Sequence, residues 1–210
     1  MERQAALNKA ALLTPLAKAF STDIANEVAS LGVQVHGGMG FVEETGAAQY
    51  LRDARILPIY EGTNGIQAID LVTRKLPLDG GTTVTSYVSE LADIIATVRA
   101  ANRTEFGHMP QRLTEAMTGL QSATLWMALM LQSAPEAALA SATPYLRLMS
   151  LTAGGVYLAK GALAEASGSP RVAIARFFAE NLLTEATGLA EAVQSGADSV
   201  LVDARGAVFA

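Results

Sequence analysis

The stretch VTSYVSELADIIATV, residues 84–98, decides the fold class, because its apolar side chains return at the spacing of a helix. The positions that share this spacing are Val84, Val88, Leu91, Ile95 and Val98. Steps of three and four residues place side chains on one face of an α-helix, whereas a half-buried strand alternates apolar and polar residues. The stretch therefore predicts an amphipathic helix with one buried side.

The same spacing extends in both directions from this segment. An apolar series runs from Leu7 to Leu31 on one side, and another runs from Leu113 to Leu131 on the other. Further helices are expected over residues 47–55, about 64–75, 142–166 and 169–193. No alternating pattern typical of a strand continues for more than a few residues. We therefore expect an all-α fold.

Helix ends are predicted from capping residues, glycine and proline. Thr14 followed by Pro15 is typical of a helix start, because a side-chain oxygen caps the first turn and proline fits the first helical position. Gly32 is expected to end the helix that follows. We also expect Asn64 to cap a helix, with Gln67 as its reciprocal partner. Ser169 and Pro170 are expected to start another helix. Gly154 and Gly155 are expected at a close helix contact or a bend.

The segment PLDGGTT, residues 77–83, is the best candidate for a domain boundary, because proline and paired glycines interrupt the helical pattern. We expect residues 1–78 to form one helical bundle. Residues 79–210 are expected to form a second, roughly antiparallel helical bundle behind it.

Composition excludes several classes of protein. Apolar residues make up 50% of the 210 residues and charged residues 17%, which favours a folded domain over disorder. A net charge of −5 argues against nucleic acid or an anionic membrane as a partner. No apolar run reaches transmembrane length, so we expect a soluble cytoplasmic protein. The chain has no cysteine and only two histidines, His36 and His108, so no metal site is expected.

Two segments depart from plain helical patterning. In LPIYEGTNGIQ, residues 57–67, Glu61 stands between apolar residues and a glycine. A carboxylate just ahead of a helix is favoured by the helix dipole, but an apolar surround also raises a carboxylate pKa into the range of a general base. Spacing alone leaves both interpretations open. In QVHGGMGFVEETG, residues 34–46, the bare glycine backbone either allows a phosphate or flavin to approach or simply makes a sharp helix connection.

Three stretches together carry a family resemblance: LGVQVHGGMGF (31–41), YLRDARILPIYEGTNGIQ (50–67) and AIDLVTRKL (68–76). They look like the C-terminal end of the catalytic portion of acyl-CoA dehydrogenases, and the match is collinear over residues 1–78. The sequence EGTNGIQAIDLVTRKL, followed by further helical segments, resembles the larger bacterial acyl-CoA dehydrogenases that carry a C-terminal extension. That subgroup includes enzymes of the 3-methylmercaptopropionyl-CoA type.

The resemblance implies an FAD-dependent oxidation of an acyl-CoA to the trans-2-enoyl-CoA. Glu61 matches the base that removes the proton alpha to the thioester carbonyl, and Thr63 matches a position near the FAD. The residues that match a loop contacting the cofactor of a neighbouring subunit are Gln34, Gly37 and Gly38. On chemical grounds, Tyr60 makes the approach to the base apolar, and Gly62 leaves room for the acyl chain and the flavin ring. We therefore expect Tyr60 and Gly62 to contact the substrate.

The resemblance also implies that the chain is a fragment. Nothing in it resembles the N-terminal helical domain or the middle β-domain that hold most of the FAD and acyl-CoA in the family. We therefore expect the chain to be inactive alone, with an exposed apolar face that favours a homo-oligomer. The alternative is a stand-alone helical interaction module that carries an idle glutamate.

Overall fold

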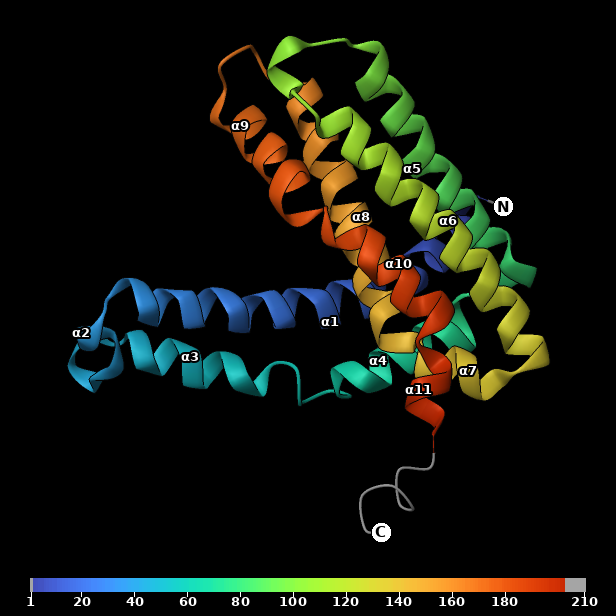
Figure 1. Ribbon diagram of the computed structural model, residues 1–210, viewed down its shortest axis with the longest axis horizontal. Helices are drawn as coiled ribbons and strands as arrows, with labels where there is room; N and C mark the ends of the chain where they lie inside the picture. The colour runs from blue at the N-terminus through green and yellow to red at the C-terminus, as the bar shows by residue number, and fades with distance from the viewer. Residues whose placement is uncertain (1, 203–210) are drawn as a thin grey trace.

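The computed structural model describes residues 2–202, and throughout this range the chain is helical with no strand. The all-α prediction is therefore confirmed. Figure 1 shows two parts: an upright bundle of long helices, and an arm that projects sideways from the lower end of the bundle. Among the helices of residues 2–202, none combines the length and the apolar character that a membrane span requires.

The arm is formed by the first part of the chain. Its elements are α1 (Glu2–Val35), α2 (Gly38–Phe41), the 3-10 turn η1 (Glu43–Thr45), α3 (Ala47–Ile56), α4 (Asn64–Asp70) and the π-helical turn η2 (Leu71–Lys75). Helix α1 contacts both α3 and α4, so the chain runs out along α1, turns at α2 and returns beside it (Figure 1).

The upright bundle follows after a reversal at η3 (Leu78–Gly81), where Asp79, Gly80 and Gly81 all have positive φ. Its elements are α5 (Thr82–Ala100), η4 (Thr104–Phe106), α6 (Met109–Ser133), α7 (Pro135–Ala140), α8 (Ala142–Leu163), α9 (Pro170–Phe177), the π-helical turn η5 (Phe178–Leu182), α10 (Glu185–Ser195) and α11 (Ala197–Leu201). Two glycines suit this reversal, because they adopt positive φ without a Cβ clash.

Helix α8 forms the centre of the core. It contacts α5, α6, α9 and α10 in the bundle and also α1 and α4 in the arm. Gly155 lies at a close helix contact, since an added Cβ would stand 3.2 Å from Leu183 Cδ2 and 3.3 Å from Phe178 Cε1. The close helix contact expected at this glycine pair is confirmed at Gly155. A single hydrophobic cluster continues from Leu12 in α1 to the bundle, so the arm and the bundle share one core.

A buried hydroxyl pair joins α6 to α8 inside that core. The hydroxyl of Tyr145 lies 2.9 Å from Thr124 Oγ1, and Thr124 also donates to the carbonyl of Leu120 at 2.7 Å. A threonine hydroxyl has one hydrogen, so Tyr145 is the donor to Thr124. Burial raises the pKa of Tyr145 above its ordinary range.

Polar contacts close the bundle at the end away from the arm. Glu180 accepts a hydrogen bond from the backbone N–H of His108 at 2.8 Å and pairs with Arg176 at 3.1 Å. The His108 N–H and the Arg176 guanidinium hold the pKa of Glu180 below its ordinary value. Gly107 lies against this pair at φ 52°, and an added Cβ there would stand 2.5 Å from Glu180 Oε1.

The predicted helix start at Thr14 and Pro15 is wrong. Helix α1 continues through both residues, and the Thr14 hydroxyl donates to the Ala10 carbonyl at 2.8 Å instead of capping a new helix. An internal proline costs a helix about 3 kcal/mol. Leu12 and Leu16, on either side of Pro15, are both buried, and their packing against the core offsets this cost.

Two other predicted helix ends shift by a few residues. Helix α1 passes Gly32 and ends at Val35, because the positive φ of Gly37 is the conformation that stops it. Thr63 rather than Asn64 caps α4, with its hydroxyl accepting from the N–H of Ile66 at 3.4 Å. The Asn64 side chain is turned toward α1 instead, where it finds stronger partners.

The helix expected over residues 169–193 begins as predicted but is not continuous. Ser169 caps α9 by accepting from the N–H of Arg171, and Pro170 is the first helical residue. The π-helical turn η5 and a break at Leu183 then separate α9 from α10. Helices α7 and α11 were not expected, because each is too short to show a period.

Candidate active site

The segment between α3 and α4 is a series of tight turns. The N–H of Tyr60 donates to the carbonyl of Ile56 at 3.1 Å, and the N–H of Asn64 donates to the carbonyl of Pro58 at 3.0 Å. Between these bonds the chain reverses at Glu61 and Gly62, which have φ values of 53° and 84°. A positive φ is uncommon for a residue with a side chain, and such strained residues cluster at functional sites.

The Glu61 carboxylate is exposed, and within residues 2–202 no lysine or arginine forms an ion pair with it. A carboxylate without a cationic partner remains available to accept a proton. Gly62 is needed next to it for two reasons. Its φ is positive, and an added Cβ would stand 3.2 Å from Nε2 of Gln67, the side chain that donates to the Glu61 carbonyl at 3.3 Å.

Three side chains on α1 fasten this turn to the arm. Lys18 Nζ donates to the carbonyl of Gly62 at 2.9 Å and to Oδ1 of Asn64 at 2.8 Å. The Asn64 Nδ2 in turn donates to Thr22 Oγ1 at 2.9 Å and to Asp23 Oδ1 at 2.7 Å. We call this set, Lys18, Thr22, Asp23 and Asn64, the α1 brace.

Sequence reasoning missed the α1 brace. A weak signal was present, because Lys18, Thr22 and Asn26 recur every four residues and form a polar stripe on a helix that is otherwise apolar on its buried side. The structure explains this stripe. Asn26 Nδ2 donates to the carbonyl of Ala54 at 3.0 Å, so the whole stripe faces the segment from α3 to α4 that runs back beside α1.

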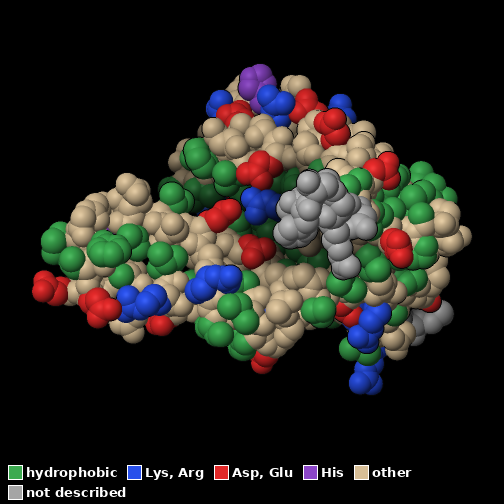
Figure 2. Space-filling model, turned by 60° about the horizontal axis from the view of Figure 1, so that its bottom comes forward, with side chains coloured by type: hydrophobic (Ala, Val, Ile, Leu, Met, Phe, Trp, Pro, Cys, Tyr) green, Lys and Arg blue, Asp and Glu red, His purple; other side chains and the backbone are tan. Residues whose placement is uncertain are grey.

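Exposed apolar side chains surround the turn. Ile59, Tyr60 and Ile66 are about half exposed, at 47%, 47% and 55%. Figure 2 shows hydrophobic side chains over the arm, with charged side chains at its tip and along one edge. The apolar residues exposed on the arm also include Val28, Leu31, Val35, Met39, Phe41, Tyr50 and Ile56. Such an extended apolar surface is typical of an interaction site.

The glycine turn at the tip of the arm lies apart from Glu61. Gln34, Gly37 and Gly38 stand where α1 passes into α2, and Glu61 stands beyond the other end of α3 (Figure 1). Helix α3 has 10 residues, so it spans roughly 15 Å. The structure therefore brings Tyr60, Glu61, Gly62 and Thr63 into one turn but does not bring the three glycine-turn residues to them.

Each glycine of the tip has its own explanation within the chain, except Gly38. Gly37 needs its positive φ, and an added Cβ at Gly40 would clash with the carbonyl oxygen of Val33 at 2.2 Å. Among residues 2–202, an added Cβ at Gly38 would meet no atom within 4 Å, and the φ of Gly38 is not positive. The backbone at Gly38 is thus bare and open, which suits a group from outside the chain.

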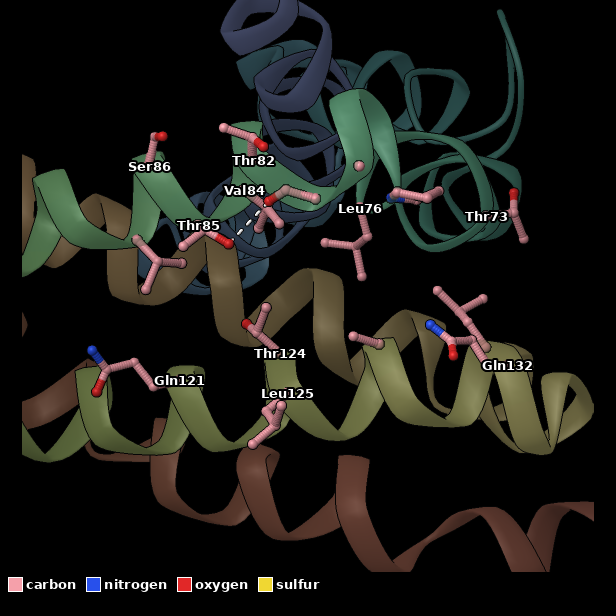
Figure 3. A pocket seen from close by; sticks show the side chains of 16 residues that line it. Thr73, Leu76, Thr82, Val84, Thr85, Ser86, Gln121, Thr124, Leu125 and Gln132 are labelled. Atoms are coloured by element: carbon pink, nitrogen blue, oxygen red, sulfur yellow. Dashed lines mark hydrogen bonds between the residues drawn. The ribbon is translucent and has the colours of Figure 1, made fainter.

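A cavity lies apart from these residues, between the start of α5 and α6 (Figure 3). It is a groove of about 930 Å³ lined by hydroxyl, amide and aliphatic groups, and its lining residues include no charged side chain. Figure 3 shows Thr85 and Thr124 among these residues, with the Thr85 hydroxyl bonded to the Gly81 carbonyl. None of the predicted site residues lines this groove.

Comparison with known proteins covers nearly the whole chain. Residues 1–76 match the family model described as acyl-CoA dehydrogenase, C-terminal domain, and residues 88–202 match the model described as acetyl-CoA dehydrogenase C-terminal like. The chain is 40% identical to 3-methylmercaptopropionyl-CoA dehydrogenase of Ruegeria pomeroyi, over 95% of this chain and 35% of that protein. It is 29% identical to a butyryl-CoA dehydrogenase of Syntrophomonas wolfei, over 90% of this chain and 33% of that protein.

A solved structure shows the same fold. Caenorhabditis elegans ACDH-11, crystallised in complex with C11-CoA, superposes with a TM-score of 0.73 at 18% identity, over 85% of this chain and 30% of that chain. The chain thus spans about a third of the length of these relatives.

Proposed function

This chain belongs to the acyl-CoA dehydrogenase family, and on that premise we propose that it is the base-bearing C-terminal part of an FAD-dependent enzyme that oxidises an acyl-CoA to the trans-2-enoyl-CoA. The observation that carries the proposal is the Glu61 turn, where a carboxylate with no ion-pair partner among residues 2–202 is held at positive φ among exposed apolar side chains. Residues 1–78 belong to the catalytic helical bundle, and residues 79–210 form the extension.

Glu61 acts as the base. The proton alpha to a thioester carbonyl is only weakly acidic, so the base must be unpaired, fixed in position and sheltered from water. Its carboxylate accepts the alpha proton while the hydride leaves the beta carbon, so the acyl chain loses two electrons and gains a double bond. FAD, when bound, accepts that hydride.

The neighbouring residues shape the space for the acyl chain. Tyr60 and Ile66 present apolar side chains on either side of Glu61, and burying such surface contributes about 25 cal/mol per Å². Gly62 presents only backbone at the point where the flat thioester approaches. Thr63 caps α4 with its hydroxyl, and by the family resemblance we assign it a position near the FAD.

The glycine turn fits the same cofactor from a different direction. The bare backbone at Gly38 has room for an outside group, and Gln34 and Gly37 stand beside it. By the family resemblance, we infer that these three residues contact the FAD of a neighbouring subunit. They lie about one α3 length from Glu61, so they do not form one site with it within this chain. This role requires a homo-oligomer, and the exposed apolar residues of the arm supply a surface for it.

The activity requires more surface than these 210 residues offer, since Glu61 and its apolar neighbours stand open to water. The test uses the flavoprotein that carries this chain at the full length of its relatives. Under anaerobic conditions, 3-methylmercaptopropionyl-CoA, butyryl-CoA and longer acyl-CoA thioesters are added in turn. We expect the flavin absorbance to bleach and one enoyl-CoA to form per flavin with at least one thioester; no bleaching with any of them would refute the proposal.

A second measurement concerns the 210 residues alone. The purified chain is mixed with FAD and passed over a desalting column, and we expect the flavin to separate from the protein. A chain that kept FAD and oxidised an acyl-CoA unaided would show that activity needs no further segment.

A further inference from the structure

The backbone at Glu61 needs support from outside its own segment. Glu61 is one of the few non-glycine residues of the described chain with positive φ, and it is followed by Gly62, also at positive φ. Glu61 and Gly62 both lie outside a helix, so their carbonyl groups need hydrogen-bond partners from elsewhere in the chain. A carboxylate on such a turn moves whenever the turn relaxes, so its direction depends on what holds these two peptides.

Side chains hold both carbonyls, one from each neighbouring helix. Gln67 of α4 donates to the Glu61 carbonyl at 3.3 Å, and Lys18 of α1 donates to the Gly62 carbonyl at 2.9 Å. The Lys18 bond is shorter and charge-assisted, and such bonds are roughly twice as strong as neutral ones. Lys18 therefore contributes the larger share of the support.

The rest of the α1 brace fixes the lysine itself. Lys18 Nζ also donates to Oδ1 of Asn64 at 2.8 Å. The Asn64 Nδ2 lies 2.7 Å from Asp23 Oδ1 and 3.1 Å from the Ala19 carbonyl, so the amide is oriented with its oxygen toward the lysine. The ammonium is thus held between two acceptors, and one of them is the carbonyl of Gly62, the residue after Glu61.

We propose that Lys18 is a positioning residue for Glu61, which fixes the direction of the carboxylate by holding the Gly62 carbonyl against α1. The proposal rests on the function proposed above for Glu61. Lys18 forms no ion pair with the Glu61 carboxylate among the described contacts, so it acts on the backbone of the turn and not on the charge of the base.

The first test needs no activity and uses the 210-residue chain. Hydrogen exchange is measured at the amide of Asn64, which is bonded to the Pro58 carbonyl across the turn. Lys18→Met keeps the length of the side chain but removes the charge-assisted bonds, and we expect exchange at this amide to become about tenfold faster or more. Lys160→Met, the same change on an exposed lysine of α8, is the matched control and should leave it unchanged.

The second test separates positioning from plain stability in the flavin-loaded, full-length enzyme. For Lys18→Met we expect the rate of flavin reduction by saturating acyl-CoA to fall about tenfold or more, with the acyl-CoA concentration at half-saturation and the apparent pKa of the reduction rate unchanged. Lys18→Arg should restore most of the rate, because a guanidinium can donate to both acceptors.

The outcomes distinguish this inference from the proposed function. Unchanged exchange at Asn64, or an unchanged reduction rate in Lys18→Met while Glu61→Gln is inactive, would overturn the positioning role and leave Glu61 as the base. A shifted apparent pKa with an unchanged maximal rate would also overturn it, because Lys18 would then act through its charge. Full flavin reduction in Glu61→Gln would instead refute the proposed function itself.

Discussion

Asn64→Ala tests whether the α1 brace holds the arm together. The Asn64 Nδ2 has three acceptors within 3.1 Å, on Ala19, Thr22 and Asp23, but only two hydrogens to donate. Its Oδ1 accepts from Lys18 at 2.8 Å. The substitution therefore removes about three hydrogen bonds, two of them to charged groups.

The magnitude follows from the exposure of these groups. A hydrogen bond to a charged group contributes about 1.5–3 kcal/mol when sheltered and a neutral one about 1 kcal/mol. Asp23 is exposed and Lys18 is half-buried, so water replaces much of what is lost. Alanine also favours the helix over asparagine by about 0.5 kcal/mol. We expect a net loss of about 2 kcal/mol in the free energy of unfolding, or a Tm lower by about 4–8 °C.

Thermal and denaturant unfolding of the 210-residue chain, followed by circular dichroism, measure this loss. Asn8→Ala is the matched control, because Asn8 also lies in α1 but, among the described residues, its side chain accepts a single hydrogen bond, from Gln4. The control should change stability by no more than about 0.5 kcal/mol. If Asn64→Ala costs no more than Asn8→Ala, the brace does not hold the arm and the positioning of Glu61 through it fails as well.

Five other substitutions probe the bundle. Gly107→Ala should lower the free energy of unfolding by about 2–4 kcal/mol, because alanine is strained at positive φ and its Cβ would clash with Glu180. Gly188→Ala is the control inside α10, where an added Cβ has open space, and it should raise the free energy of unfolding by about 0.5–1 kcal/mol. Equal effects of the two substitutions would contradict the packing described at Gly107. The pKa of Glu180 is lowered in the folded state, so its contribution to stability is present above the unfolded-state pKa and is lost as the pH falls through the folded-state pKa. In Glu180→Gln, the free energy of unfolding from denaturant titrations should therefore decrease less steeply below about pH 5. An unchanged dependence of this free energy on pH would exclude the contribution of Glu180. Tyr145→Phe should cost about 1 kcal/mol in thermal unfolding, because Thr124 keeps its bond to the Leu120 carbonyl. Thr124→Val should cost more, about 1–3 kcal/mol, because it leaves the buried Tyr145 hydroxyl without this partner; the reverse order would contradict this explanation.

Much of the fold could be predicted from periodicity. The spacing of Leu91, Ile95 and Val98 predicted α5, and these residues are buried in the structure. Local capping chemistry likewise predicted the start of α9 at Ser169. These predictions succeed because the interactions involved lie within one or two helical turns of each other.

The predictions failed where distant segments decide the local structure. Pro15 lies inside α1 because burial of the flanking leucines outweighs the local preference for a break. Asn64 does not cap α4 because α1 offers it acceptors 41 to 45 positions away along the chain. The same holds for the site. The residues of the YEGT stretch form one turn, but its tie to Lys18, 44 positions earlier, depends on the return of the chain beside α1.

Replacement of the proposed base is the most direct test of the account. Anaerobic stopped-flow mixing of the full-length flavoprotein with an acyl-CoA gives the rate of flavin reduction for the unaltered enzyme, for Glu61→Gln and for Glu44→Gln, an exposed carboxylate at the tip of the arm. We predict that Glu61→Gln keeps its FAD but loses a factor of about 10²–10⁴ or more in rate, while Glu44→Gln reduces its flavin normally. A Glu61→Gln enzyme that reduced its flavin at the normal rate would contradict the assignment of Glu61 as the base.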